Sequence, residues 1–156
     1  MLGLYHLLPS VQQRKREGTD WVVLEGPEMG LHPQAVTAVM LLVLDLLWRG
    51  YKVVLSTHSP HVLTMLWMMR QLKSHQARWQ LVCEAFNVDP VPAMKQVAVS
   101  ALEKEYRAHL LQFDAEGKGY SMDISALDPS AEDERIAGWG GLTEFPPVLV
   151  MLYGSL

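Results

Sequence analysis

The chain alternates short apolar runs with longer segments whose apolar residues recur every three or four positions. Residues 21–24 and 51–55 are apolar runs of strand length, and the segment between them has the periodicity of an amphipathic helix. That helix begins at Pro33, because proline lacks an N–H that would have no partner in the first turn. It ends at about Arg49, and Gly50 supplies the stop. The pattern predicts a strand, a helix and a second strand that is adjacent and parallel to the first.

Further elements follow the second strand. Ser59 as a cap and Pro60 in the first turn predict a helix that runs to about Leu72. Residues 78–87 have a weaker helical pattern, and after a proline-rich break a short helix ends at about residue 105.

The last third of the chain changes character. Residues 106–113 and 120–125 have β-like patterns, and the glycine-containing residues between them predict a hairpin. Beyond residue 128 we expect irregular structure, and the apolar residues 148–152 suit either a closing strand or a free end. At the other terminus, residues 2–8 suit the end of a buried helix, and residues 12–19 suit a solvated loop.

Polar residues follow both predicted strands directly after their apolar runs. The first strand leads into Glu25, and Glu28 follows just past Pro27. The second strand leads into four residues with hydroxyl or imidazole groups, namely Ser56, Thr57, His58 and Ser59. The carboxyl ends of parallel strands meet at one edge of a sheet, where ligands commonly bind. Carboxylates beside hydroxyls and an imidazole suit a phosphate chain that carries Mg²⁺.

Two motifs carry a resemblance to a known family. The sequence VVLEGPEMGLHP occupies residues 22–33, and VVLSTHSP occupies residues 53–60. Together they resemble the Walker B strand, D-loop and H-loop of ABC-type ATPases, in particular the OLD-like and RecF/SMC-like AAA branch. Either motif alone would be weak, but the two occur in the order and spacing of that family.

The resemblance implies ATP and Mg²⁺ as cofactors and assigns roles to single residues. Glu25 would help to position Mg²⁺, and His58 would contact the γ-phosphate. The implied catalytic residues are His58 and Glu28, although Glu28 equally suits a bracing role through backbone N–H groups. The implied nucleotide-binding residues are Glu25, Gly30, Leu31, His32, Ser56, Thr57 and His58. Residues 30–32 would also meet a second protomer.

The chain departs from the family pattern at two points. No GxxxxGK[ST] sequence occurs, so the Walker A loop that cradles the phosphates is missing. Gly26 stands where the family has its catalytic glutamate. We therefore expect an α/β fold that is part of a P-loop ABC-ATPase-like domain, the carboxyl-terminal part without its front half. Residues 1–88 would form the Walker B and H-loop part, and residues 89–156 a small helix, a β-hairpin and an irregular tail.

Composition narrows the alternatives only slightly. A net charge of −4 over 156 residues offers no basic surface for nucleic acid, so we expect such contact only through an assembled complex. The single Cys83 excludes an intramolecular disulfide and a cysteine zinc cluster, which fits the cytoplasm. No apolar stretch reaches the roughly 20 residues that cross a bilayer, and we expect no membrane role.

Two functions from different classes remain. The first is a partial ATPase domain that supplies the Mg²⁺-binding acid and the phosphate-sensing histidine to a site completed by a Walker A half. Its partner would be a second copy of the chain or a separate ATPase half. The second is a non-catalytic interaction protein that keeps part of the ATPase fold, which the missing Walker A loop and Gly26 both favour.

Overall fold

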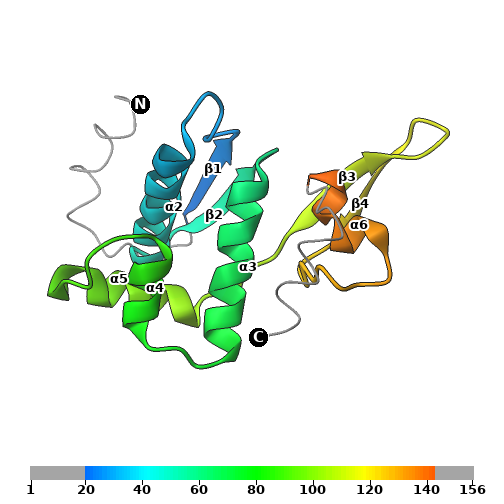
Figure 1. Cartoon of the computed structure of the whole chain (residues 1–156). Coiled ribbons are helices and arrows are strands. Elements are labelled where there is room, and N and C mark those ends of the chain that lie inside the picture. Colours follow the sequence, from blue (N-terminus) through cyan, green and yellow to red (C-terminus); the bar gives the residue numbers. More distant parts are fainter. Residues whose placement is uncertain (1–19, 143–156) are drawn as a thin grey trace.

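The structure, a computed structural model, describes residues 20–142 (Figure 1). Within this range a parallel pair of strands and four helices form one part of the molecule, and a β-hairpin with two short helical turns forms the other. The predictions for residues 2–8, 12–19 and 148–152 lie outside the described residues.

The predicted strand–helix–strand unit is present. Strand β1 (Trp21–Glu25) and strand β2 (Lys52–Ser56) pair in parallel, and helix α2 (Pro33–Trp48) connects them. Pro33 occupies the first turn of α2, and Gly50 follows its end with a φ of +94°, as the sequence predicted. Each strand ends one residue later than predicted. The carboxyl ends of the strands are therefore the polar residues themselves.

The two faces of this small sheet differ in exposure. Side chains alternate along a strand, so Val22, Leu24 and Leu55 lie on a half-buried face. The opposite face carries Trp21 and Val23, which are 61% and 73% exposed. The parallel pair is thus covered from one side only within the described part of the chain.

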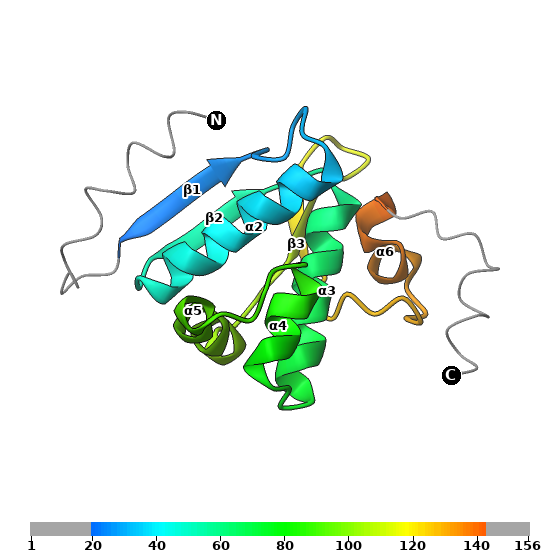
Figure 2. The same ribbon diagram turned by 60° about the vertical axis from the view of Figure 1, so that its left-hand side comes forward.

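Helices α3 (Pro60–Ser74), α4 (Trp79–Ala85) and α5 (Pro92–Glu103) complete the main core (Figure 2). Helix α5 packs against both α2 and α4. The core is built from twelve buried residues: Val36, Met40, Leu44, Val62, Met65, Met69, Val82, Cys83, Phe86, Val97, Ala98 and Ala101. All three predicted helices are confirmed. The predicted domain division after residue 88 stays a prediction.

The predicted hairpin is also present, from β3 (His109–Phe113) to β4 (Gly119–Asp123), with His109 opposite Asp123. It sits on a second, smaller core that shares helix α3 with the first, because Leu63 of α3 packs there with Ala108, Ile124 and Leu127. The predicted first strand was too long, since residues 106–108 lie before β3.

The prediction of irregular structure beyond residue 128 is confirmed for residues 129–133 but was wrong for residues 134–141. Helix α6 (Glu134–Ala137) and the 3₁₀ turn η1 (Trp139–Gly141) form there. Asp133 caps α6 by accepting a hydrogen bond from the N–H of Arg135. The ring of Trp139 is 2% exposed, and its indole N–H donates to the Leu127 carbonyl at 3.0 Å. Burial of this indole holds the turn in place.

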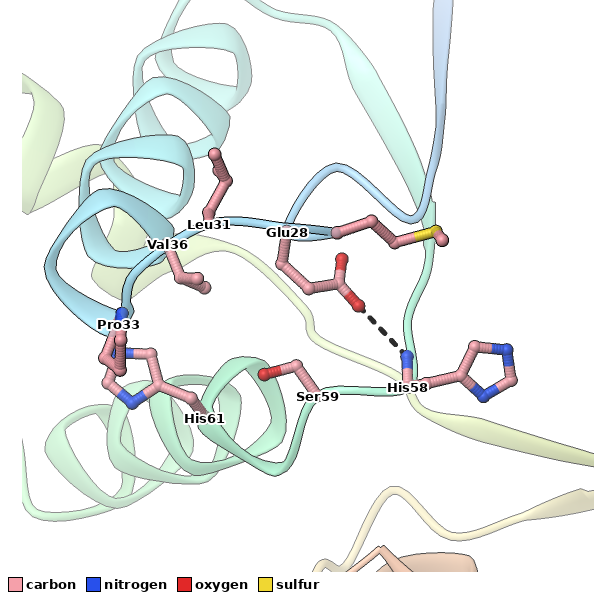
Figure 3. Close-up of a pocket in the computed structure, with 8 residues that line it drawn as sticks. Glu28, Leu31, Pro33, Val36, His58, Ser59 and His61 are labelled. Carbon is pink, nitrogen blue, oxygen red and sulfur yellow. Dashed lines mark hydrogen bonds between the residues drawn. The ribbon is translucent and has the colours of Figure 1, made fainter.

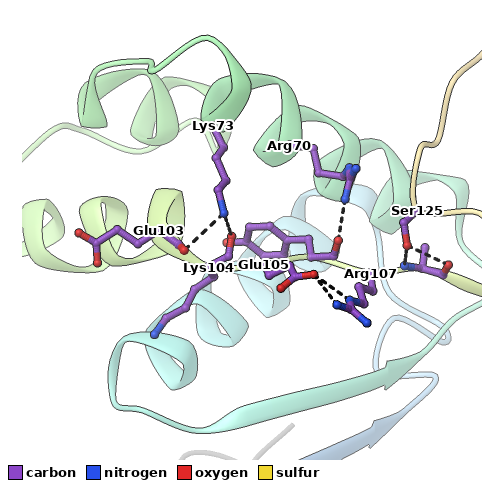
Figure 4. Close-up of polar contacts among 9 residues, drawn as sticks. Arg70, Lys73, Glu103, Lys104, Glu105, Arg107 and Ser125 are labelled. Atoms are coloured by element: carbon purple, nitrogen blue, oxygen red, sulfur yellow. Dashed lines mark hydrogen bonds and ion pairs between the residues drawn. The ribbon is translucent and has the colours of Figure 1, made fainter.

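Two cations of α3 hold the segment between α5 and β3 (Figure 4). Arg70 donates to the Tyr106 carbonyl at 2.7 Å, and Lys73 donates to the Lys104 carbonyl at 2.7 Å. The hydroxyl of Tyr106 in turn donates to the Ala101 carbonyl at the end of α5. The bonds from Arg70 and Lys73 satisfy carbonyl groups that neither a helix nor a strand uses, and they join the two parts of the molecule.

Candidate functional site

The predicted site lies where β1 and β2 end side by side. Glu25 is the register partner of Ser56, and the N–H of Gly26 donates to the Ser56 carbonyl at 3.0 Å. Both Glu25 and Ser56 are exposed. The structure therefore places an accessible carboxylate beside an accessible hydroxyl at the edge where the sequence predicted a ligand.

The loop after β1 consists of two consecutive turns. The N–H of Met29 donates to the Gly26 carbonyl, and the N–H of Leu31 donates to the Glu28 carbonyl, each at 3.0 Å. Gly26 has a φ of +47° and Gly30 a φ of +73°, in the left-handed region that glycine adopts without strain. The turns direct Glu28 inward, where it is 8% exposed, and leave Met29 77% exposed.

Glu28 joins this loop to the stretch after β2 (Figure 3). Its Oε1 accepts hydrogen bonds from the Thr57 hydroxyl and from the N–H of His58, the latter at 3.0 Å. The Thr57 hydroxyl oxygen also accepts from the N–H of Ser59 at 2.9 Å. Oε2 is buried and has no hydrogen-bond partner among the described residues.

Opposing effects act on the pKa of the Glu28 carboxyl. Burial, the largest effect, raises this pKa. Hydrogen bonds from the Thr57 hydroxyl and from backbone N–H groups, together with the His58 imidazole, lower the pKa, and the net result lies below the usual value of 4.5. Glu28 is therefore an ionised carboxylate at neutral pH, held by donors from the neighbouring loop.

The imidazole of His58 points away from Glu28 and is exposed (Figure 3). Only its backbone is hydrogen-bonded within residues 20–142. Beside it lies an open cleft of about 280 Å³, lined by Glu28, Met29, Leu31, Pro33, Val36, His58, Ser59 and His61. The cleft separates the loop after β1 from the start of α3.

The start of α3 differs in one detail from the sequence prediction. Ser59 is its N-cap residue, but its side chain makes no capping hydrogen bond. His61, the second residue of α3, forms a hydrogen bond with Thr37 of α2, with 3.0 Å between Nε2 of His61 and Oγ1 of Thr37. The sequence offers no local signal for this pair, because the two residues lie 24 positions apart.

The remaining predicted residues follow Glu28 along the loop. Gly30 is exposed, and Leu31 is half-buried against the main core. His32 is the N-cap residue of α2, and its Nδ1 accepts from the N–H of Gln34 at 3.4 Å. Leu31 and His32 therefore have structural roles, while Gly30 remains open to solvent.

The acidic residues of the site suit Mg²⁺, which keeps water and phosphate ligands, better than a metal ion that is bound entirely by protein side chains. Among residues 20–142 no group of three or more His, Cys, Asp or Glu side chains could hold a metal ion. Mg²⁺ commonly takes one or two carboxylates and fills its other positions with water and phosphate oxygens. The exposed carboxylate of Glu25 fits that demand, whereas Oε1 of Glu28 is occupied by two donors and its Oε2 is buried.

Comparison with known families gives one match. The model of the family described as "AAA domain, putative AbiEii toxin, Type IV TA system" matches residues 1–64. These residues resemble a nucleotide-binding ATPase-type domain. The match supports a P-loop ATPase-like family for the part of the chain that contains both strand ends, and such a domain implies dependence on a nucleotide and Mg²⁺.

No curated protein and no solved structure matches the chain. None of the helices within the described residues is both long enough and apolar enough to cross a membrane. The family match ends within α3, so α4, α5 and the hairpin lie beyond it.

Proposed function

We propose that this chain contributes the Mg²⁺-binding acid and the phosphate-sensing histidine to an ATP site that a Walker A half completes. The observation that carries the proposal is the paired strand end, where Glu25 lies opposite Ser56 and the exposed His58 follows two residues later. The family match over residues 1–64 supports a nucleotide as the ligand.

Glu25 is the metal-binding residue in this proposal. Its carboxylate is exposed at the end of β1, and no described residue donates a side-chain hydrogen bond to it. A bound Mg²⁺ would neutralise negative charge on the phosphate oxygens. The hydroxyl of Ser56, the register partner of Glu25, lies on the same side of the sheet and would bind a phosphate oxygen.

His58 is the phosphate-sensing residue. Its imidazole is exposed, while its backbone N–H is tied to Glu28 at 3.0 Å. A side chain that is held at its backbone and open at its ring can donate a hydrogen bond to an oxygen of the terminal phosphate. The Thr57 hydroxyl already makes two internal hydrogen bonds, so its role is to support the stretch.

The site is incomplete for hydrolysis in this proposal. The chain has no Walker A sequence, and Gly26 offers no carboxylate to orient an attacking water. A separate ATPase half would supply the Walker A loop, which a second copy of this chain also lacks, and the exposed Gly30 would face that partner. We therefore expect nucleotide binding to drive association, with slow hydrolysis.

A second function is a non-catalytic interaction protein that retains the ATPase-like fold. The sheet face that carries Trp21 and Val23 is largely exposed, as an interaction surface would be. In this alternative the strand ends would bind no nucleotide.

A titration with Mg-ATP followed by NMR separates the two functions. The proposal predicts amide shifts at Glu25, Gly26 and residues 56–59, without saturation below about 1 mM, because Walker A amides supply most phosphate affinity. The variant Glu25→Gln should lose the Mg²⁺-dependent part of these shifts. The matched control Glu116→Gln, in the exposed hairpin loop, should keep them.

Two outcomes would contradict the proposal. An absence of shifts at the strand ends up to about 10 mM Mg-ATP, where even a weak site is mostly filled, favours the interaction protein. A dissociation constant in the micromolar range would show that the site does not need a Walker A half.

A further inference from the structure

The stretch after β2 is tied to a single carboxylate. Glu28 Oε1 accepts from the hydroxyl of Thr57 and from the N–H of His58, and the Thr57 oxygen accepts from the N–H of Ser59. Three consecutive residues are therefore fixed by one side chain from another loop, directly or through one hydroxyl.

The position of this carboxylate makes the contacts strong. Glu28 is 8% exposed, and hydrogen bonds to an ionised group are about twice as strong as those between neutral groups. The carboxylate also lies at the amino-terminal end of the 15-residue helix α3, where backbone N–H groups have no partner within the helix. The side chain of the N-cap residue Ser59 makes no capping bond, and the N–H groups just before the helix, those of His58 and Ser59, donate to Glu28 and Thr57.

We infer that Glu28 is a positioning residue, whose carboxylate sets the backbone of residues 57–59 and thereby the direction of the His58 imidazole. The ring of His58 points away from Glu28 and makes no hydrogen bond within the described residues (Figure 3). The backbone therefore sets the direction of the His58 Cα–Cβ bond and the rotamers that the ring prefers, and Glu28 holds this backbone.

Further geometry separates this role from proton transfer. Oε1 of Glu28 accepts two hydrogen bonds, and Oε2 is buried away from solvent. Neither oxygen is open to an attacking water, so Glu28 acts through His58. The backbone of Glu28 is also tied within its own loop, because its carbonyl accepts from the N–H of Leu31 at 3.0 Å, while its side chain reaches the stretch after β2. A shift of residues 29–31 on contact with a partner would therefore reach His58.

The benefit of an aligned His58 rests on the proposed function, but the alignment itself can be tested without nucleotide. Thr57→Val removes the hydroxyl and Glu28→Gln removes the charge, whereas Thr57→Ser keeps the hydroxyl. NMR of the full chain measures the His58 amide proton shift and the couplings that report its side-chain rotamer. Thr57→Val and Glu28→Gln should both move the amide proton upfield and average the rotamer. Thr57→Ser should restore the values of the unchanged protein.

Thr64→Val is the matched control. Thr64 lies in α3, and its hydroxyl donates only to the Pro60 carbonyl at 2.9 Å, so its loss should leave His58 unchanged. If Glu28→Gln does not fold, the three threonine variants decide the question, since Thr57 is only half-buried.

The outcomes distinguish this inference from the proposed function. An unchanged His58 in both Thr57→Val and Glu28→Gln would overturn the positioning role, whatever the nucleotide titration shows. Identical effects of Thr57→Ser and Thr57→Val would overturn it as well, because the hydroxyl would then be irrelevant. If His58 moves as expected but the unchanged protein shows no Mg-ATP shifts, the positioning role stands and the nucleotide proposal fails. If the positioning role and the nucleotide proposal both hold, Mg-ATP should cause a shift at His58 that is at least about threefold smaller in Thr57→Val than in the unchanged protein, because the alignment of His58 is lost.

Discussion

At the scale of single residues, the position that departs from the ATPase pattern also has a special backbone. Gly26 has a φ of +47°, and its carbonyl accepts the N–H of Met29 in the first turn of the loop. A Cβ atom at Gly26 would approach Met29 Sδ to 2.8 Å. Met29 is 77% exposed, so its side chain can move away, and the main cost of any side chain is the left-handed backbone.

The first prediction concerns this backbone cost. Gly26→Ala should lower the free energy of unfolding by about 1–2 kcal/mol, since the left-handed region disfavours a Cβ atom. Gly30→Ala should cost about as much, because Gly30 has a φ of +73°, but a Cβ atom there would meet no other atom within 4 Å, so the difference between the two variants reports the contact with Met29. Urea denaturation of the two variants measures the difference. A smaller loss for Gly26→Ala than for Gly30→Ala would mean that the first turn relaxes.

A second prediction concerns the same glycine in an assembled site. If the chain is joined to a compatible Walker A half, Gly26→Glu should raise ATP turnover at least about tenfold, because a general base contributes roughly 10²–10⁴ in rate. The effect on ATP affinity should be smaller, since the residue acts on the attacking water. Steady-state kinetics measures both quantities. Equal turnover in the two versions would place the catalytic step on another residue.

A third prediction follows from the lowered pKa of Glu28. A carboxyl whose pKa is lower in the folded than in the unfolded chain adds stability above the unfolded value of 4.5. That contribution disappears as the pH falls through the folded pKa. Glu28→Gln should therefore flatten the loss of stability below about pH 4.5. Urea denaturation across this range, with Glu116→Gln as the exposed control, isolates the contribution of Glu28. Parallel curves for Glu28→Gln and the unchanged protein would contradict it.

At the scale of elements, helix α3 connects the two parts of the molecule. It faces the main core through Val62 and Met65 and the smaller core through Leu63. Its cations Arg70 and Lys73 hold the segment that leads from α5 to the hairpin. The position of the hairpin therefore depends on α3 and on the few side chains around Tyr106.

The fourth prediction tests one of those side chains. Burial raises the pKa of Tyr106, so its hydroxyl stays protonated and donates to the Ala101 carbonyl at 2.7 Å. Tyr106→Phe should cost about 0.5–1.5 kcal/mol, the usual net value of an intramolecular hydrogen bond. Tyr120→Phe removes a hydroxyl that donates to Gln112 in the exposed hairpin and should change stability little. Thermal or urea unfolding measures the loss of stability in both variants. Equal losses would contradict the predicted role of the Tyr106 hydrogen bond.

At the scale of the whole molecule, the described part leaves apolar surface on two elements. Trp21, Val23 and Val54 are exposed on the parallel pair, and Leu111 and Phe113 are 78% and 80% exposed on the hairpin. A pair of strands also leaves backbone groups free at its edges. On the parallel pair, Lys52 lies 5.2 Å from the centre of the Trp21 ring and covers part of that face.

The fifth prediction is that the chain self-associates or binds a partner polypeptide through the parallel pair. Exposed edges beside an apolar face promote association. Val23→Thr, which keeps a β-branched side chain, should lower the mass measured by light scattering at high concentration. Leu111→Thr on the hairpin is the comparison and should lower this mass less. A stable monomer at all concentrations would instead indicate a self-sufficient small domain.

Much of the fold was predictable from the sequence because its signals are local. Pro33 and Gly50 mark the ends of α2, the apolar runs mark β1 and β2, and glycines mark the loop of the hairpin. Each signal acts within a few residues, through backbone geometry or a missing N–H. The parallel pairing followed from the helix-length connection between the strands. Together these signals also placed Glu25 and Ser56 at neighbouring strand ends.

The tertiary structure alone decided which polar groups are free and which are engaged. Glu28 and Thr57 lie 29 positions apart, and only packing of the two loops turns them into a partly buried hydrogen-bonded pair. Trp139 stood in a segment expected to be irregular, yet its ring is buried against Leu127 and holds a turn. Such contacts depend on burial between distant segments, which periodicity does not encode. The sequence by itself determined where the chemistry-bearing residues gather, and the fold decided that Glu28 braces this site while Glu25 and His58 face solvent.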